Sequence, residues 1–137
     1  MKYLEFRDLF IKNIIVRIQD IKKLDPGFDR RRLYEWQQKG HLTKIINGVY
    51  IFNEVEIDEF ILFLIANRIN EHSYVSLQTA LNYYGLIPES VYQIMSVTTK
   101  KTNFYATKLT EFSYNSILSE YYFGYQLLKT NRSTILI

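Results

Sequence analysis

The sequence contains no cysteine and only two histidines among its 137 residues. The absence of cysteine excludes a disulfide framework, a thiolate zinc site and a cysteine nucleophile. The two histidines, His41 and His72, lie in different segments, so we expect each to be a surface or capping residue rather than a catalytic base. No HExxH, Gly-rich phosphate loop or GxSxG motif occurs. We therefore expect no enzymatic activity and no cofactor.

Long hydrophobic runs are missing as well. The longest spans residues 60–66, far short of the roughly 20 residues that cross a bilayer. The first residues, "MKYLEFRDLF", carry acidic side chains and lack the apolar core of a signal peptide. Together with the absence of cysteine, this favours a soluble, cytoplasmic protein with no membrane partner.

One acidic cluster could hold a hard cation in principle: Glu54, Glu56, Asp58 and Glu59. It coincides with an expected helix start, where the helix dipole favours carboxylates without any metal. We expect no metal site.

The charges that are present divide the chain unevenly. Residues 1–53 hold eleven Lys or Arg against six Asp or Glu, whereas residues 54–137 hold six against eight. The net charges of these two parts are therefore +5 and −2. A basic N-terminal part favours a polyanionic partner, although a solvated basic surface would give the same count.

Local signals predict the elements of the basic part. We expect a helix over residues 2–13, with Leu4, Leu9 and Phe10 buried, a β-branched run over 14–18, a helix over 19–24 and a turn at 25–27. Asp29 can cap a helix over 30–39, and Gly40 can end it. Strands over 41–46 and 49–52 flank Asn47-Gly48, a pair typical of a type I′ hairpin turn. This order is that of a winged helix-turn-helix, with the hairpin as the wing.

A helical wheel at about 100° per residue places Leu33 and Trp36 of the 30–39 helix on one side, as the core face. The opposite face carries side chains that could read bases, and its flanks carry cations that could contact phosphates. Two wing residues could touch a neighbouring phosphate or the minor groove. The predicted DNA-binding set is Arg30, Arg31, Arg32, Tyr34, Gln38, Lys39, Lys44 and Asn47.

The chain changes character after Phe52. A mostly apolar helix is expected to begin near Ile57 and to need cover on nearly all sides, either between the two parts or in a dimer interface. A second helix over 77–85 would be capped by Ser76 and closed by Gly85. Five short segments rich in Tyr, Phe and Thr then predict a meander of strands: 90–102, 103–109, 110–117, 121–128 and 133–137. The expected fold class is α+β, with a winged-helix domain over 1–56 and a helix-plus-antiparallel-sheet domain over 57–137.

The residues leave three functions open. The first is a repressor that binds double-stranded DNA. The second is a protein-interaction module whose winged helix does not bind DNA. The third is a single-stranded RNA binder that uses the nine tyrosines between Tyr74 and Tyr125, although the net charge of −2 in that region opposes it.

The segment "SYVSLQTALNYYGLIPESVYQIMSVTTKKT" (residues 73–102), followed by "FSYNSI" and "YYFGY", resembles the AbiEi family of antitoxins and transcriptional regulators of type IV toxin–antitoxin systems. The upstream "LYEWQQKGHLTKIINGVYIF" is similar to the family's winged helix. The resemblance implies a cytoplasmic protein that binds inverted repeats near its own promoter and opposes a nucleotidyltransferase toxin. Pairing of two chains into a homodimer is one arrangement that the apolar helix near Ile57 leaves open. The resemblance also implies a further helical segment beyond Ile137, so we expect a fragment or a short member.

Overall fold

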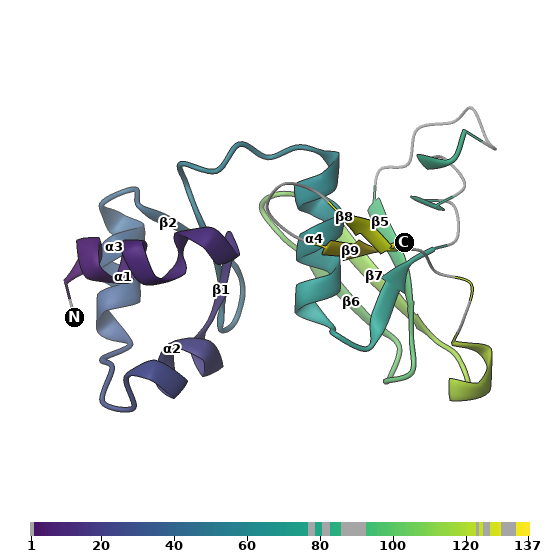
Figure 1. Cartoon of the computed structure of the whole chain (residues 1–137), viewed down its shortest axis with the longest axis horizontal. Coiled ribbons are helices and arrows are strands. Elements are labelled where there is room, and N and C mark those ends of the chain that lie inside the picture. Colours follow the sequence, from purple (N-terminus) through teal and green to yellow (C-terminus); the bar gives the residue numbers. More distant parts are fainter. Residues whose placement is uncertain are drawn as a thin grey trace. The chain divides into compact units, whose positions relative to one another are not determined.

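The computed structural model describes residues 2–76, 79–80, 83–85, 93–122, 124, 127–129 and 134–137, with the backbone alone for 127–129 and 134–136. The architecture is mixed α+β (Figure 1). Contacts between Cα atoms divide the chain into two compact units, residues 1–56 and residues 57–137. Unit 1 holds eleven Lys or Arg against eight Asp or Glu, a net charge of +3, and unit 2 holds six against six, a net charge of zero.

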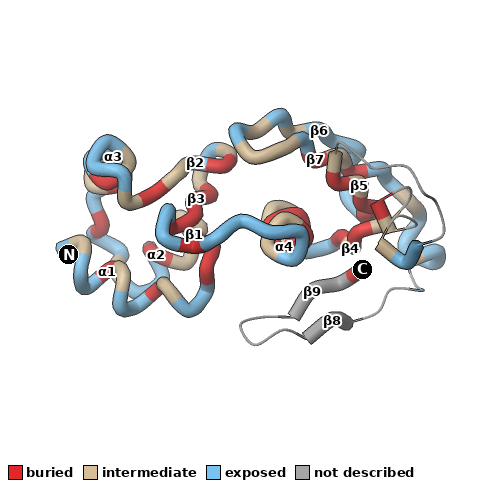
Figure 2. The backbone as a smooth tube through the Cα atoms, turned by 90° about the horizontal axis from the view of Figure 1, so that it is seen from above, coloured by how far each residue is buried: buried red, intermediate tan, exposed pale blue. Residues whose placement is uncertain are grey.

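Unit 1 consists of short helices and one small sheet. Its elements in chain order are α1 (Tyr3–Phe10), a 3₁₀ turn (Ile11–Asn13), β1 (Ile15–Arg17), α2 (Ile18–Leu24), α3 (Arg31–Gln38), β2 (Leu42–Ile46) and β3 (Val49–Phe52). The sheet has the order β1-β3-β2, and both pairings are antiparallel. Central β3 is buried along its whole length, as the red tube in Figure 2 shows.

An aromatic cluster around Phe6 forms the core of unit 1. Phe6 is fully buried, and its ring centroid lies 4.6 Å from that of Trp36 and 5.6 Å from that of Phe52. The expectation that Leu4 and Leu9 are buried is wrong, because they are 71% and 52% exposed. Five positions separate the two leucines, which places them about 140° apart on a helix, so one face cannot bury both. Phe6 and Phe10, four positions apart, share the buried face.

The connections of unit 1 follow its turn residues. The Phe28 amide donates to the Asp25 carbonyl across Asp25-Pro26-Gly27, at 3.0 Å. The 47–48 turn differs from the expected type I′ geometry, which needs positive φ at both positions. Gly48 has φ +82°, whereas Asn47 does not have positive φ. A register shift between Lys44 and Ile46 accommodates the difference, since an extra residue in one strand increases the local twist.

Unit 2 is a helix packed on a mixed sheet. It contains α4 (Glu59–Ile69), β4 (Ser73–Val75), β5 (Gln93–Thr98), β6 (Asn103–Ala106), β7 (Glu111–Ser116), a 3₁₀ turn (Ser119–Tyr121), β8 (Leu127–Lys129) and β9 (Thr134–Leu136). The main sheet has the order β4-β5-β7-β6, and β8 pairs separately with β9. The predicted helix over 77–85 lies partly outside the described residues.

The expected antiparallel meander is wrong at one position: β7 lies between β5 and β6 and runs parallel to β5. Burial follows this order. Phe112 and Tyr114 in β7 are almost completely buried, whereas most of β6 is exposed. Each of the two strands carries one Phe and one Tyr, and only β7, which has a neighbouring strand on both sides, buries both.

Helix α4 covers the inner face of the sheet, so its apolar side chains are buried within unit 2, whereas the expectation was cover between the two parts or in a dimer interface. Phe63, Leu64, Ile65 and Ala66 are buried, and the helix contacts β4, β5 and β9. Its first turn is capped by Asp58, whose Oδ1 accepts from the Ile61 amide at 2.9 Å. Asp58 therefore has a structural role at the helix N-terminus, whereas Glu54 accepts from the Arg7 guanidinium at 2.7 Å.

Replacing Tyr114 by Phe should destabilise unit 2 by about 1–2 kcal/mol, because the buried Ala66 carbonyl would lose a hydrogen-bond donor. The Tyr114 hydroxyl donates to that carbonyl at 2.5 Å. Burial raises the pKa of Tyr114 well above its usual 10.0. The unfolded chain therefore releases this proton first, so this contribution to stability is complete below pH 10 and is lost as the pH rises further. Urea unfolding at pH 8 and pH 11 measures both effects, and exposed Tyr121→Phe is the control.

Candidate nucleic-acid interface

Helix α3 is held by one buried face. Leu33 and Trp36 are 1% and 4% exposed, as the wheel predicted. The Asp29 carboxylate accepts from the Arg31 amide at 3.0 Å, which satisfies a donor that the helix start leaves without a partner. At the other end, the His41 amide donates to Trp36 and the Gly40 amide donates to Gln37, with Gly40 at φ +80°. These bonds end the helix in a Schellman motif.

The predicted base-reading residues of α3 lie on the opposite face. Arg31 and Gln38 are exposed, and Tyr34 is 64% exposed. Of the predicted flanking cations, Arg30 and Lys39 are exposed, whereas Arg32 is half-buried. Eight residues at 1.5 Å each give α3 a length of about 12 Å.

Arg31 is already paired within the unit. Its Nε and Nη2 atoms donate to the Asp29 carboxylate at 3.2 and 3.0 Å. The hydrogen bond from Arg31 lowers the pKa of Asp29, and the same bond raises the pKa of Arg31. The Arg31 side chain is nevertheless 88% exposed. Such exposed pairs are weak, so a stronger acceptor could replace Asp29.

The predicted set omits three exposed charged residues of α2 and α3. Glu35 is exposed and lies one helical turn after Arg31, on the outer face that also carries Gln38. Lys22 and Lys23 are exposed in the last turn of α2, the helix that precedes the turn into α3. The position of the two lysines can be read from the sequence, because cations just before Asp25-Pro26-Gly27 are typical of the last turn of a helix.

The hairpin carries the other two predicted residues, Lys44 on β2 and Asn47 in the turn, both exposed. Figure 1 shows β2 following directly from the end of α3, and the two elements are in contact. The Asn53 side chain fixes this junction. Its Nδ2 donates to the Gly40 carbonyl at 2.7 Å, and its Oδ1 accepts from the Thr43 hydroxyl. The turn itself is held to α2, because the Ile18 amide donates to the Gly48 carbonyl at 2.9 Å. Sequence patterns gave no indication of Asn53.

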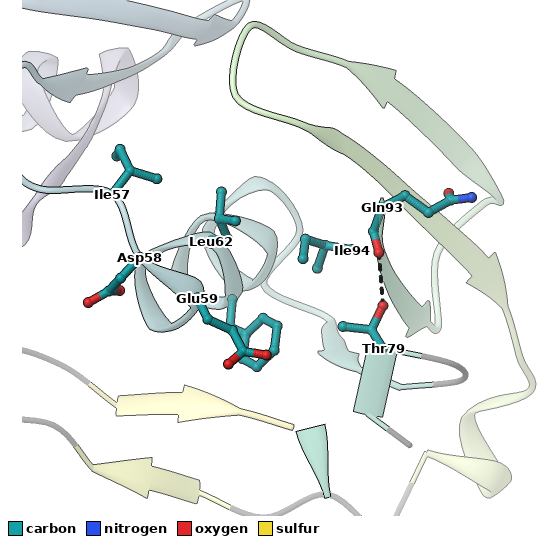
Figure 3. A pocket seen from close by; sticks show the side chains of 8 residues that line it. Ile57, Asp58, Glu59, Leu62, Thr79, Gln93 and Ile94 are labelled. Carbon is teal, nitrogen blue, oxygen red and sulfur yellow. Dashed lines mark hydrogen bonds between the residues drawn. The ribbon is translucent and has the colours of Figure 1, made fainter. Parts of the chain in front are cut away.

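A separate hollow lies beside the start of α4 in unit 2 (Figure 3). Its volume is about 330 Å³. Ile57, Leu62, Phe63 and Ile94 supply apolar lining, and Thr79 donates to the Gln93 carbonyl at its edge at 3.0 Å. The charged lining residues are Asp58 and Glu59, so the hollow is unsuited to a phosphate group.

The histidines and acidic residues take structural positions. The His41 ring stacks on Tyr3 with centroids 4.0 Å apart, and the His72 amide donates to the Asn70 side chain at 3.0 Å. Among the residues that the structure describes, no group of three or more His, Cys, Asp or Glu could hold a metal ion.

The tyrosines of unit 2 are mostly half-buried or buried. Tyr105 packs edge-on against Tyr114, and Tyr74 packs edge-on against Tyr122. Of the seven described tyrosines between Tyr74 and Tyr122, Tyr84 and Tyr121 are exposed. Tyr92 and Tyr125 lie outside the described residues. The strand tyrosines therefore serve mainly as packing groups.

Helix α4, the longest helix in the part of the chain that the structure describes, has 11 residues. Within the described part of the chain, no helix has the length and apolar character needed to cross a membrane. Neither a protein-family model nor a curated protein sequence matches this chain.

Proposed function

We propose that residues 1–56 form a winged helix-turn-helix that binds double-stranded DNA, and that the chain is a cytoplasmic, non-enzymatic transcriptional repressor of the AbiEi antitoxin type. One observation carries the DNA-binding proposal. The outer face of α3 presents Arg31, Tyr34 and Gln38 to solvent, between the exposed cations Arg30 and Lys39. Such a face combines bidentate donors for bases with cations for phosphates.

The setting of α3 supports the proposal. α2 and α3 are joined by a short turn, and the β2–β3 hairpin follows. In a helix-turn-helix, the second helix enters the major groove and the first crosses the backbone. Lys22 and Lys23 on α2 would then meet phosphates, and Lys44 would meet a phosphate beside the groove.

The antitoxin part of the proposal is carried by the resemblance of residues 73–102 to the AbiEi family. By that resemblance, the protein would bind inverted repeats near its own promoter and would oppose a nucleotidyltransferase toxin. A nucleotidyltransferase gene directly downstream is the expected genomic neighbour. Co-expression of that gene with this chain should restore growth, and continued growth arrest would contradict antitoxin activity.

A protein-docking role for unit 1 is the second candidate. Two observations favour it: the Arg31 guanidinium is paired with Asp29, and Glu35 lies on the same outer face. A face with both charges on it is complementary to a mixed-charge protein surface.

Electrophoretic shift assays with the region upstream of its own gene separate the two roles. We expect a shift of the duplex that weakens steeply as salt rises, because phosphate contacts release counterions. A scrambled duplex of the same length should bind more weakly at equal salt. Absence of a shift at low salt with either duplex would refute DNA binding and favour docking.

A further inference from the structure

The face of the unit 2 sheet opposite α4 exposes an aromatic ring. Phe112 and Tyr114 of β7 are buried toward the helix, and the Tyr114 hydroxyl reaches Ala66 of α4. Since side chains alternate along a strand, Ser113 lies on the opposite face together with its cross-strand partner Phe104. Phe104 is 53% exposed.

This outer face continues across the sheet. Met95 of β5 is the cross-strand partner of Ser113 and is half-buried, so Phe104, Ser113 and Met95 form one row over β6, β7 and β5. The ring of Phe104 stands at the edge of this row, on the strand that ends the sheet. It is therefore accessible to a flat group approaching from solvent.

Cations flank this ring on both sides along the chain. Lys100 and Lys101 precede β6, Lys108 lies in the turn after it, and all three are exposed. They are three of the six Lys and Arg residues in 57–137, and Glu111 is the one acidic residue in the sequence between Thr99 and Ser119. Glu111 lies on this same face, since it is two positions from Ser113 and pairs with Ala106 of β6, so the three lysines outnumber it along β6 and β7.

We propose that this surface, defined by Phe104, Ser113 and the three lysines, binds single-stranded nucleic acid. An unpaired base would stack on Phe104, and phosphates would lie near Lys100, Lys101 and Lys108. Seven residue steps separate Lys101 from Lys108, or roughly 20 Å along an extended strand, which is enough for a few nucleotides. Sheet faces with exposed aromatic rings and flanking cations bind single strands in this way, whereas a duplex keeps its base faces stacked inside.

The test measures the binding of fluorescein-labelled (dT)10 to the full chain by anisotropy at low salt. Phe104→Leu keeps an apolar side chain but removes the ring, and binding should weaken at least fivefold, since one stacked base contributes about that much or more. Phe104→Trp should retain binding, and the emission of the new indole should be quenched by the oligonucleotide. Leu118→Ala, at another exposed apolar residue of unit 2, should bind as the parent does. Phe104 is exposed, so all variants should melt at the parent temperature.

The lysines are tested by their salt dependence. Replacing Lys100, Lys101 and Lys108 together by Gln should lower the slope of log K against log salt by about 2, because each lost phosphate contact on a single strand contributes about 0.7. Excess unlabelled duplex should leave the quenching of the Phe104→Trp indole by (dT)10 in place, because the duplex is proposed to bind α3 and not this surface. Failure of the parent chain to bind (dT)10, equal binding by Phe104→Leu, or complete displacement by duplex would each overturn the proposal. None of these results bears on whether α3 binds duplex DNA.

Discussion

Trp36→Ala should destabilise unit 1 by roughly 3–5 kcal/mol, the usual cost of removing a large buried aromatic side chain. The Trp36 ring contacts three others, with centroids 4.6 Å from Phe6, 5.6 Å from Tyr3 and 5.9 Å from Phe28. At about 0.05–0.15 kcal/mol per residue, a unit of this size has a stability of only about 3–8 kcal/mol. The substitution should therefore remove a large part of the stability of unit 1, and circular dichroism during urea unfolding would show the loss as a lower midpoint.

A matched control lies two positions away on the same helix. Tyr34 is an aromatic residue on the outer face and is 64% exposed, so Tyr34→Ala should change stability by less than about 0.5 kcal/mol. If Trp36→Ala and Tyr34→Ala unfolded at the same urea concentration, the ring cluster would not be the core of unit 1. Any loss of DNA binding in Trp36→Ala should disappear at temperatures where the variant is folded.

The features of unit 1 that depend on residues close together in the sequence were predicted well. Asp29 and Gly40 lie at the two ends of α3, and Leu33 and Trp36 form its core face. These features were predictable because caps and helical periodicity act over one or two turns. The hairpin was predicted for the same reason. Its turn type was not, since the positive φ is confined to Gly48 and the register shift depends on how β2 pairs with β3.

Features that depend on distant contacts were predicted poorly. The parallel pairing of β5 with β7 joins strands that are not consecutive in the chain, and no local pattern encodes a strand order. The strand β4 was missed because three residues are too few for a periodic signal. Asn53 joins the end of α3 to the hairpin across 13 positions, so its role could not be seen before the chain was folded.

In the candidate interface, too, the features set by local residues were predicted and those set by side-chain contacts were not. Exposure of Arg31, Tyr34 and Gln38 followed from the wheel, because a face opposite a buried stripe faces water. The wheel also places Glu35 on that outer face, where its carboxylate is an acceptor beside the donors of Arg31 and Gln38. The Asp29–Arg31 pair depends on rotamers that sequence does not specify. It changes the chemistry expected of Arg31, since base contact must first replace this partner.

Arg31→Ala and Lys44→Ala should weaken DNA binding in different ways. If Arg31 makes a bidentate contact with guanine, its loss should weaken binding to the operator roughly 5- to 150-fold and change binding to a scrambled duplex much less. If Lys44 contacts a phosphate, its loss should weaken binding to both duplexes by the same factor and lower the salt slope by about one unit. Both side chains are exposed, so neither change should alter the melting temperature measurably.

Asp29→Asn is the matched variant for the Arg31 pair. An Asn oxygen can still accept from the Arg31 amide, so the start of α3 is kept. The variant removes the negative charge that holds the guanidinium and repels phosphates, so operator binding should be unchanged or tighter. The comparison of all three variants is made by titrating operator and scrambled duplexes at several salt concentrations. Equal losses on both duplexes for Arg31→Ala and Lys44→Ala would mean that α3 does not read bases, and protein docking would become the better account of its outer face.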